Sequence, residues 1–210
     1  AGKVALCPVE HDHKTLPSAL FYPVGKSPVY GRSAIAQFST GEDGRFMRSL
    51  KRMLGTSTMN YGTLINDRPR RFEEIIGGFV SLLKTRAEAL GNDNIESVVM
   101  GRPVHFVDRD PDADFAAETQ LAGVARAAGF KHIEFQFEPI AAAFAHERHL
   151  TSEKLAIVVD IGGGTSDFTV IRLGPDRMDK PERTSDILGN AGTRIGGNDF
   201  VRDLGVAAVM

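Results

Sequence analysis

Apolar and polar positions in the middle of the chain alternate between the strand and the helix pattern. Strand-type apolar runs occur at residues 95–100, 133–137 and 155–160, the last with the continuous apolar character of a strand buried on both faces. Helical periodicity occupies the intervening residues 112–128 and 139–149. The order strand, helix, strand, helix, strand predicts an α/β fold with helices on the faces of a sheet.

The N-terminal part begins with strand and turn patterns, including a short strand at residues 16–22. Apolar residues at a spacing of four then predict a helix over residues 42–54. A longer helix is predicted over residues 70–90, and the glycine pair at 77–78 in its middle indicates a kink or close packing there.

Glycine-rich turns dominate the C-terminal part. Residues 168–173 are β-branched and apolar, so the glycines at 162–164 are expected to join two strands. A short strand at 185–188, a second glycine turn within 189–197 and a helix from residue 198 complete the expected order of elements.

Composition limits the function classes. The 210 residues allow one or two domains, and 25 basic against 27 acidic residues exclude a general polyanion binder, so nucleic acid is not an expected partner. Cys7 is the single cysteine, which excludes disulfides and multi-cysteine zinc sites; we expect a buried, inert thiol on a strand at 3–7. No apolar run reaches the roughly 20 residues of a membrane helix, so we expect a cytoplasmic location.

The first glycine turn carries the strongest chemical signal. Three successive glycines, residues 162–164, can direct backbone N–H groups toward phosphate oxygens. Asp160 precedes them, and a carboxylate beside phosphates requires a cation, which indicates magnesium held largely through water. Thr165 and Asp167 add a hydroxyl group and a second carboxylate. The alternative is a plain tight hairpin; a dinucleotide-binding turn is excluded because a strand follows.

Three other features have simpler interpretations. Residues 25–27 imitate the end of a P-loop, but Leu20 stands where that motif requires glycine. The His-Asp-His run at 11–13 is interpreted as a solvated turn rather than a metal site. The basic stretches at 45–52 and 68–71 are interpreted as solvated helix faces.

Two charged residues are ambiguous when taken alone. Glu138 precedes Pro139 at the start of a helix, where a carboxylate stabilises the positive N-terminus. Lys51 is, by itself, a lysine on an amphipathic helix.

Several segments together resemble a known superfamily, the ATPases that include actin, sugar kinases and heat-shock chaperones. The segments are residues 159–168 (VDIGGGTSDF), 137–146 (FEPIAAAFAH), 49–55 (SLKRMLG), 196–200 (GGNDF) and 15–18 (TLPS). Their content and order are similar to DnaK-type chaperones. Residues 101–106 (GRPVHF), together with the Glu138 segment, most resemble the YegD-like branch.

The resemblance implies a partial actin-like, ribonuclease-H-like fold. Residues 1–153 would form a first lobe that is incomplete at its N-terminus, and residues 154–210 would begin a second lobe. A further phosphate hairpin would precede this stretch, and adenosine-binding and peptide-binding segments would follow it. We therefore expect the whole protein to be an ATPase, and this stretch alone to bind Mg-ATP weakly and to be inactive.

The resemblance also implies roles for individual residues. Asp160 would hold magnesium-bound water, Glu138 would position the attacking water or the metal shell, and Lys51 would neutralise charge on the γ-phosphate. The phosphates of ATP or ADP would lie against Gly162, Gly163, Gly164, Thr165, Gly196 and Gly197. The magnesium ligands would be Asp160 and Asp167.

Alternative functions remain open at this point. They are a sugar- or acetate-kinase-like phosphotransferase, a non-catalytic actin-like scaffold, and a YegD-like protein that binds nucleotide without chaperone coupling. Arg102 stands where typical chaperones carry an apolar residue, and Arg109 does not match their allosteric arginine, so coupling to a peptide-binding domain is open. Expected partners are nucleotide and, through regions outside this stretch, unfolded peptides and co-chaperones.

Overall fold

The computed structural model describes residues 5–91, 93–180 and 182–209. The chain forms two compact units, one of Ala1–Val98 with Thr119–Ile133 and one of Val99–Glu118 with Glu134–Met210. These units do not follow the lobe boundary expected at residue 153, which stays a prediction.

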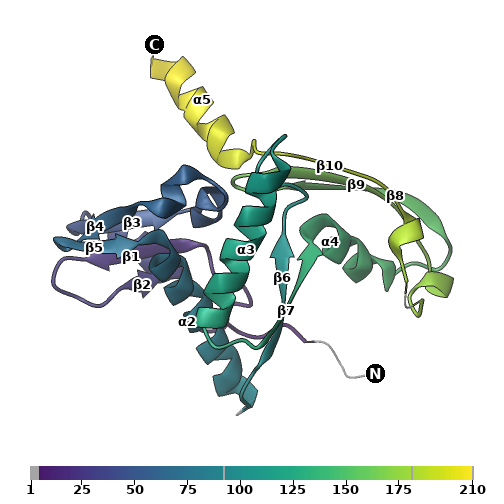
Figure 1. Cartoon of the computed structure of the whole chain (residues 1–210), viewed down its shortest axis with the longest axis horizontal. Helices are drawn as coiled ribbons and strands as arrows, with labels where there is room; N and C mark the ends of the chain where they lie inside the picture. Colours follow the sequence, from purple (N-terminus) through teal and green to yellow (C-terminus); the bar gives the residue numbers. More distant parts are fainter. Residues whose placement is uncertain (1–4, 92, 181, 210) are drawn as a thin grey trace. The chain divides into compact units, whose positions relative to one another are not determined.

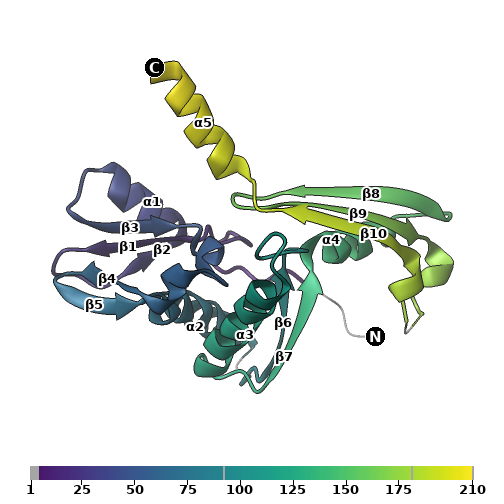
Figure 2. The ribbon, with the colours of Figure 1, turned by 45° about the horizontal axis from the view of Figure 1, so that its top comes forward.

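A three-stranded antiparallel sheet with one helix opens the first unit. Its elements are β1 (Ala19–Pro23), β2 (Val29–Tyr30), α1 (Gly31–Ser39) and β3 (Gly44–Arg48), with strand order β2-β1-β3. Phe21 on β1 lies opposite Phe46 on β3, and both pack with Ala34 of α1. The helix therefore covers this face of the sheet (Figure 2).

The helix expected over residues 42–54 is wrong. The segment instead forms β3 and a short 3-10 turn, η1 (Leu50–Met53), and α1 was not predicted. The reason is tertiary: Phe46 pairs across the sheet with Phe21, and this pairing overrides a spacing of four.

The expectation for the thiol is also wrong. Residues 5–7 belong to no strand and Cys7 is exposed, while residues 3 and 4 of the expected strand lie outside the described residues.

A hairpin and a long helix complete the first part of this unit. They are β4 (Gly62–Ile65), β5 (Arg68–Arg71) and α2 (Phe72–Gly91), preceded by η2 (Ser57–Asn60). The basic residues 68–71 are solvated as expected, but on a strand rather than a helix. A side chain at Gly78 would meet the Tyr30 hydroxyl at 3.0 Å, which confirms close packing at this glycine, whereas a side chain at Gly77 would meet nothing within 4 Å.

The strand–helix–strand pattern of the middle is confirmed. It consists of β6 (Ser97–Arg102), α3 (Pro111–Ala127) and β7 (His132–Phe137), and β6 pairs with β7. Gly129, which follows α3, has a φ of 94°, the left-handed conformation typical of a helix end.

The second unit is built on an antiparallel sheet of order β10-β9-β8. Its elements are α4 (Glu138–Glu147), β8 (Lys154–Ile161), β9 (Ser166–Leu173), η3 (Pro175–Arg177), η4 (Thr184–Asp186), β10 (Ile187–Thr193) and α5 (Gly197–Val209). Ile140 and Ala143 of α4 form a buried cluster with Ile171 and Leu173 of β9, so α4 covers one face of the sheet (Figure 1).

The face of β8 that points away from α4 is exposed, although the sequence predicted a strand buried on both faces. Leu155, Ile157, Val159 and Ile161 each expose more than half of their surface. The strand expected to be buried on both faces is therefore covered on one face only within the described part of the chain.

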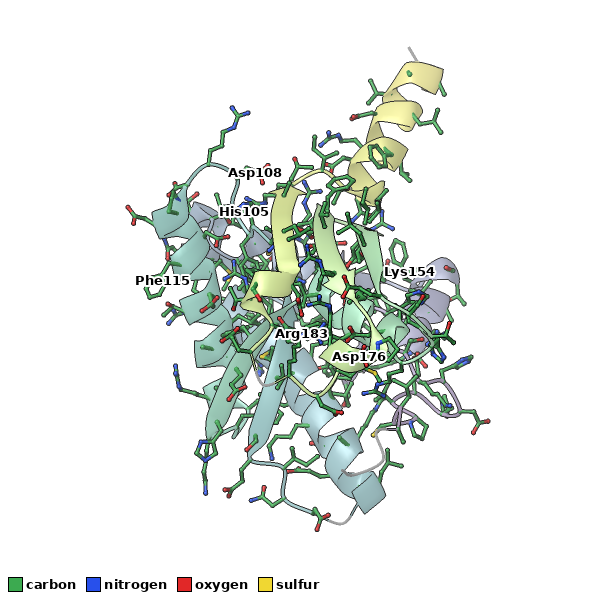
Figure 3. The ribbon with its side chains drawn as sticks, turned by 90° about the vertical axis from the view of Figure 1, so that its right-hand side faces the viewer. His105, Asp108, Phe115, Lys154, Asp176 and Arg183 are labelled. Carbon is green, nitrogen blue, oxygen red and sulfur yellow. The ribbon has the colours of Figure 1, made fainter. Side chains whose placement is uncertain are left out.

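A buried cluster of charged residues lies at the C-terminal end of β9. Its members are Glu147, Arg183 and Asp186. The Glu147 residue, 2% exposed, accepts hydrogen bonds from the Gly174 N–H at 2.7 Å and from the Arg183 guanidinium at 2.9 and 3.0 Å. Arg183, which Figure 3 labels, also donates to Asp186 at 2.6 Å, and its guanidinium lies 4.7 Å from the centroid of the Phe144 ring. The cluster thus ties the end of α4 to the connection between β9 and β10.

The titration of Asp186 reflects this environment. Burial favours the neutral acid, but the hydrogen bonds and positive charges of Arg183 and Arg177 outweigh it and lower the pKa of Asp186. The carboxylate is therefore stabilised in its charged form.

Replacing Glu147 by Ala should destabilise the chain by about 3–5 kcal/mol, because it leaves the Arg183 guanidinium buried without its main partner. Urea denaturation measures the change. Glu153→Ala is the matched control: Glu153 is also paired with an arginine, Arg177, but its side chain is 57% exposed, so its loss should cost less than about 1 kcal/mol. Equal losses in both variants would contradict a buried structural role for Glu147.

Candidate functional site

Two aspartates face each other at the end of the β8–β9 hairpin. Asp160 on β8 lies directly opposite Asp167 on β9, and directly opposed residues project from the same face of a sheet. Because side chains alternate along a strand, this is the face that carries Ile171 and Leu173 beneath α4. The acid pair therefore sits at the open end of the face that α4 covers.

Glu138 joins the pair from α4. It is the first residue of that helix, and a side chain built at Gly101 would meet its Cγ at 3.0 Å and its Oε1 at 3.1 Å. Its charge acts on Asp167, as does that of Asp160. The structure therefore brings together three of the predicted site residues, which come from three separate segments.

The environment of Asp167 disfavours the charged form of its carboxyl group. Asp167 is 1% exposed, and this burial raises its pKa. Hydrogen bonds from the Val104 N–H, at 2.8 Å, and from the Thr165 hydroxyl oppose the rise. The nearby carboxylates of Glu138 and Asp160 add to it, and the net pKa is raised. A cation placed here would relieve the repulsion among the three carboxylates.

The donors fit magnesium only if water or phosphate oxygens complete its shell. Carboxylate oxygens are the ligands that Mg²⁺ prefers, and the ion usually keeps several waters. Among the described residues, no group of three or more histidine, cysteine, aspartate or glutamate side chains is arranged to hold a metal by itself. The assignment of Asp160 and Asp167 as magnesium ligands stays a prediction.

The first glycine turn joins two strands, as the sequence indicated. The Gly162 N–H donates to the Thr165 carbonyl at 2.9 Å and closes the hairpin. Within the described residues, the N–H groups of Gly163 and Gly164 donate to no protein acceptor. Two backbone donors are therefore available to an anion at the tip of the hairpin.

The second glycine turn packs directly on the first. The N–H groups of Gly197 and Asn198, at the start of α5, donate to the carbonyls of Gly162 and Gly163 at 2.9 and 3.0 Å. A side chain at Gly196 would come within 2.6 Å of the Gly164 nitrogen. The two turns predicted to bind phosphate are therefore in contact, and the contact requires glycine at position 196.

The earlier glycines of this segment differ from the prediction. Gly189 and Gly192 lie in β10 rather than in a turn. Gly192 has its own constraint, because it lies opposite Asp167 and a side chain there would approach the Asp167 Oδ1 to 2.6 Å. Glycine at this position leaves room for the buried carboxylate.

Lys51 belongs to the first unit, where it lies in the η1 turn rather than on the expected amphipathic helix. The remaining predicted site residues belong to the second unit. The part that Lys51 takes in the site stays a prediction.

Sequence reasoning missed the residues that hold the loop after β6 against the site. The Val104 N–H binds Asp167, and Asp108 accepts hydrogen bonds from the Thr193 hydroxyl at 3.3 Å and the Arg194 N–H at 2.9 Å. Figure 3 labels Asp108 and its neighbour His105 in this loop. In the sequence, the one feature that could have indicated a role for this loop was its position directly after a predicted strand.

Arg102 has a structural role. Its guanidinium donates to Asp114 at 2.7 Å and to Glu118, and it lies between the rings of Phe106 and Phe137 at 5.0 and 5.2 Å. An arginine thus connects the end of β6 to the first turns of α3.

Comparison with known proteins agrees with this arrangement. Residues 63–205 match the Hsp70 protein family. The chain is also 28% identical over 201 residues to the chaperone protein DnaK of Thermotoga petrophila and to that of Thermotoga sp. strain RQ2. The alignments cover 95% of this chain but only 31% of either relative. No helix in the described part of the chain has the length and apolar character needed to cross a membrane.

Substituting Gly196 by Ala should lower the free energy of unfolding by about 1–3 kcal/mol, because the new methyl group must displace the backbone of the first glycine turn. Gly189→Ala provides the control. A side chain there meets nothing within 4 Å, so the change should stay within about 0.5 kcal/mol. If urea denaturation found both variants equally stable, the two glycine turns would not be in contact.

Proposed function

Because the chain belongs to the Hsp70 family, we propose that it forms part of the ATP-binding unit of a DnaK-like chaperone ATPase. The observation that carries the proposal is the meeting of Glu138, Asp160 and Asp167 beside two glycine turns in contact. Oxygen ligands and open backbone donors are the groups that a magnesium-bound polyphosphate requires.

The glycine turns would bind the phosphates. The N–H groups of Gly163 and Gly164 would donate to phosphate oxygens, and Gly196 and Gly197 would let the second turn approach equally closely. Glycine serves here because it has no side chain between backbone and ligand. Thr165 would add its hydroxyl group at the edge of the same turn.

The acidic residues would hold the magnesium ion and orient the attacking water. Bound magnesium would neutralise phosphate charge, with Asp160 and Asp167 holding it mainly through its water ligands. Glu138, at the start of α4, would orient the attacking water. Lys51 would offset the negative charge that develops on the γ-phosphate.

The finer assignments extend this proposal. The chain spans about 31% of the length of its DnaK relatives, so ATP hydrolysis and the binding of peptides and co-chaperones are proposed for the whole protein. We place it in the YegD-like branch because of residues 101–106. In this segment Arg102, which stands where typical chaperones carry an apolar residue, pairs with Asp114 and Glu118. We propose on this ground that coupling to a peptide-binding domain differs from that of typical chaperones.

In the whole protein, Asp160→Asn, Glu138→Gln and Lys51→Ala should each slow ATP hydrolysis about 100- to 1,000-fold, because each removes one preorganised charge from the transition state. Single-turnover kinetics with saturating Mg-ATP measure the chemical step. Lys154→Ala and Asp176→Asn are matched charge changes on the surface of the second unit (Figure 3) and should leave the rate within about threefold. Rates within about threefold of the unmodified protein for all three site variants would refute the assignment.

A further inference from the structure

The first unit contains a cavity of about 480 Å³ that the proposed ATPase site does not use. It lies between β1, the loop and strand that follow it, the β4–β5 hairpin and the first turns of α2. Pockets for small molecules in proteins typically measure about 300–1,000 Å³. The cavity is therefore large enough for a small molecule.

Two tyrosines form part of its wall. Tyr22 and Tyr30 are half-buried, and within the described residues neither hydroxyl group has a hydrogen-bond partner. The Tyr30 ring packs against Phe79 with ring centroids 6.3 Å apart. Neither hydroxyl oxygen is among the buried side-chain atoms that lack a partner, so both remain accessible and can form a hydrogen bond with a bound molecule.

Both hydroxyl groups are proton donors at neutral pH. Burial raises the pKa of Tyr22 to about 12, with a contribution from neighbouring Tyr30 that Arg70 opposes. Burial also raises the pKa of Tyr30. Each hydroxyl group can therefore donate a hydrogen bond to an acceptor oxygen of a ligand.

Positive charge surrounds the tyrosines. Lys26, Arg68 and Arg70 line the cavity together with one carboxylate, Glu74. Because Lys26 also pairs with Glu42 at 2.5 Å, the net excess is one positive charge. The Arg70–Glu74 pair is open, at 3.5 Å with both side chains about half exposed, and such pairs are weak. Arg68 has no carboxylate partner among the described residues. Guanidinium groups favour phosphate and carboxylate oxygens, which they can bind through two parallel hydrogen bonds.

The cavity is held open by local backbone structure. Asn66 and Asp67, in the turn between β4 and β5, both have left-handed φ values of 51° and 60°. The Asn66 side-chain amide donates to the Pro23 carbonyl at 3.2 Å. This hydrogen bond ties the β4–β5 turn to the end of β1, so it holds two walls of the cavity together.

We propose that this cavity binds a small molecule that carries a phosphate monoester on an aromatic ring. The tyrosine hydroxyls and the guanidinium groups of Arg68 and Arg70 bind the phosphate oxygens. The cavity is larger than a phosphate ion, and the ring occupies the remaining space against the faces of Tyr22 and Tyr30. The site lies in the first unit and shares no residue with the glycine turns, so it is independent of the ATPase proposal.

Phenyl phosphate is a direct probe of this site. The chain has three tyrosines and no tryptophan, and Tyr61 is 67% exposed and does not line the cavity. In a Tyr61→Phe background, tyrosine emission therefore reports on Tyr22 and Tyr30 alone. We expect a saturable change in emission, with a dissociation constant below about 1 mM by calorimetry. The absence of saturable binding would overturn the proposal.

Substitutions and related probes test the assigned contacts. The double variant Arg68→Ala/Arg70→Ala should weaken binding at least about tenfold, and Tyr22→Phe or Tyr30→Phe about three- to tenfold. Arg71→Ala, next along β5, removes an arginine that pairs with Glu73 outside the cavity and should change affinity less than about twofold.

Two further results would overturn parts of the proposal. If phenol bound as tightly as phenyl phosphate, the cavity would not recognise the phosphate group. If inorganic phosphate bound as tightly as phenyl phosphate, the cavity would not recognise the aromatic ring. Lys154→Ala, an exposed charge change in the second unit, should bind phenyl phosphate normally, which controls for a general effect of charge. Circular dichroism of each variant confirms that the fold is retained.

Discussion

The register of the β8–β9 hairpin determines the candidate ATPase site. It places Asp160 opposite Asp167 and the three glycines at the tip, so that carboxylates and backbone donors lie together. A shift of one residue in one strand would send that strand's aspartate to the opposite, solvent-facing side of the sheet. The core contacts of α4 with Ile171 and Leu173 stabilise this register, because the same shift would also expose those side chains.

The two anion sites that we propose for this chain use different chemical groups. The glycine turns offer backbone N–H groups and depend on the absence of side chains, as the close approach of Gly196 to Gly164 demonstrates. The cavity of the first unit instead offers tyrosine hydroxyls and arginines, whose charge is available without a metal. The first arrangement suits a polyphosphate that brings its own cation, and the second suits a single phosphate group.

Much of the fold and part of the site could be predicted from the sequence. The apolar periodicity of the sequence predicted β6, α3, β7, α4 and α2. The glycines within residues 160–167 predicted the β8–β9 hairpin. The prediction of a helix over residues 42–54 was wrong because Phe46 pairs with Phe21 of the neighbouring strand, a contact that the local spacing of apolar residues does not show. The Val104 donor and the space left by Gly192 could not be predicted, because both depend on contacts between segments distant in sequence.

We propose above all that the first glycine turn binds phosphate through its backbone N–H groups. The most direct measurement is an NMR titration of the whole protein, carrying isotope-labelled glycine, with Mg-ADP. We expect the amide signals of Gly163 and Gly164 to shift as nucleotide binds, because their N–H groups gain an acceptor. Saturable nucleotide binding that leaves both signals unchanged would contradict the proposal.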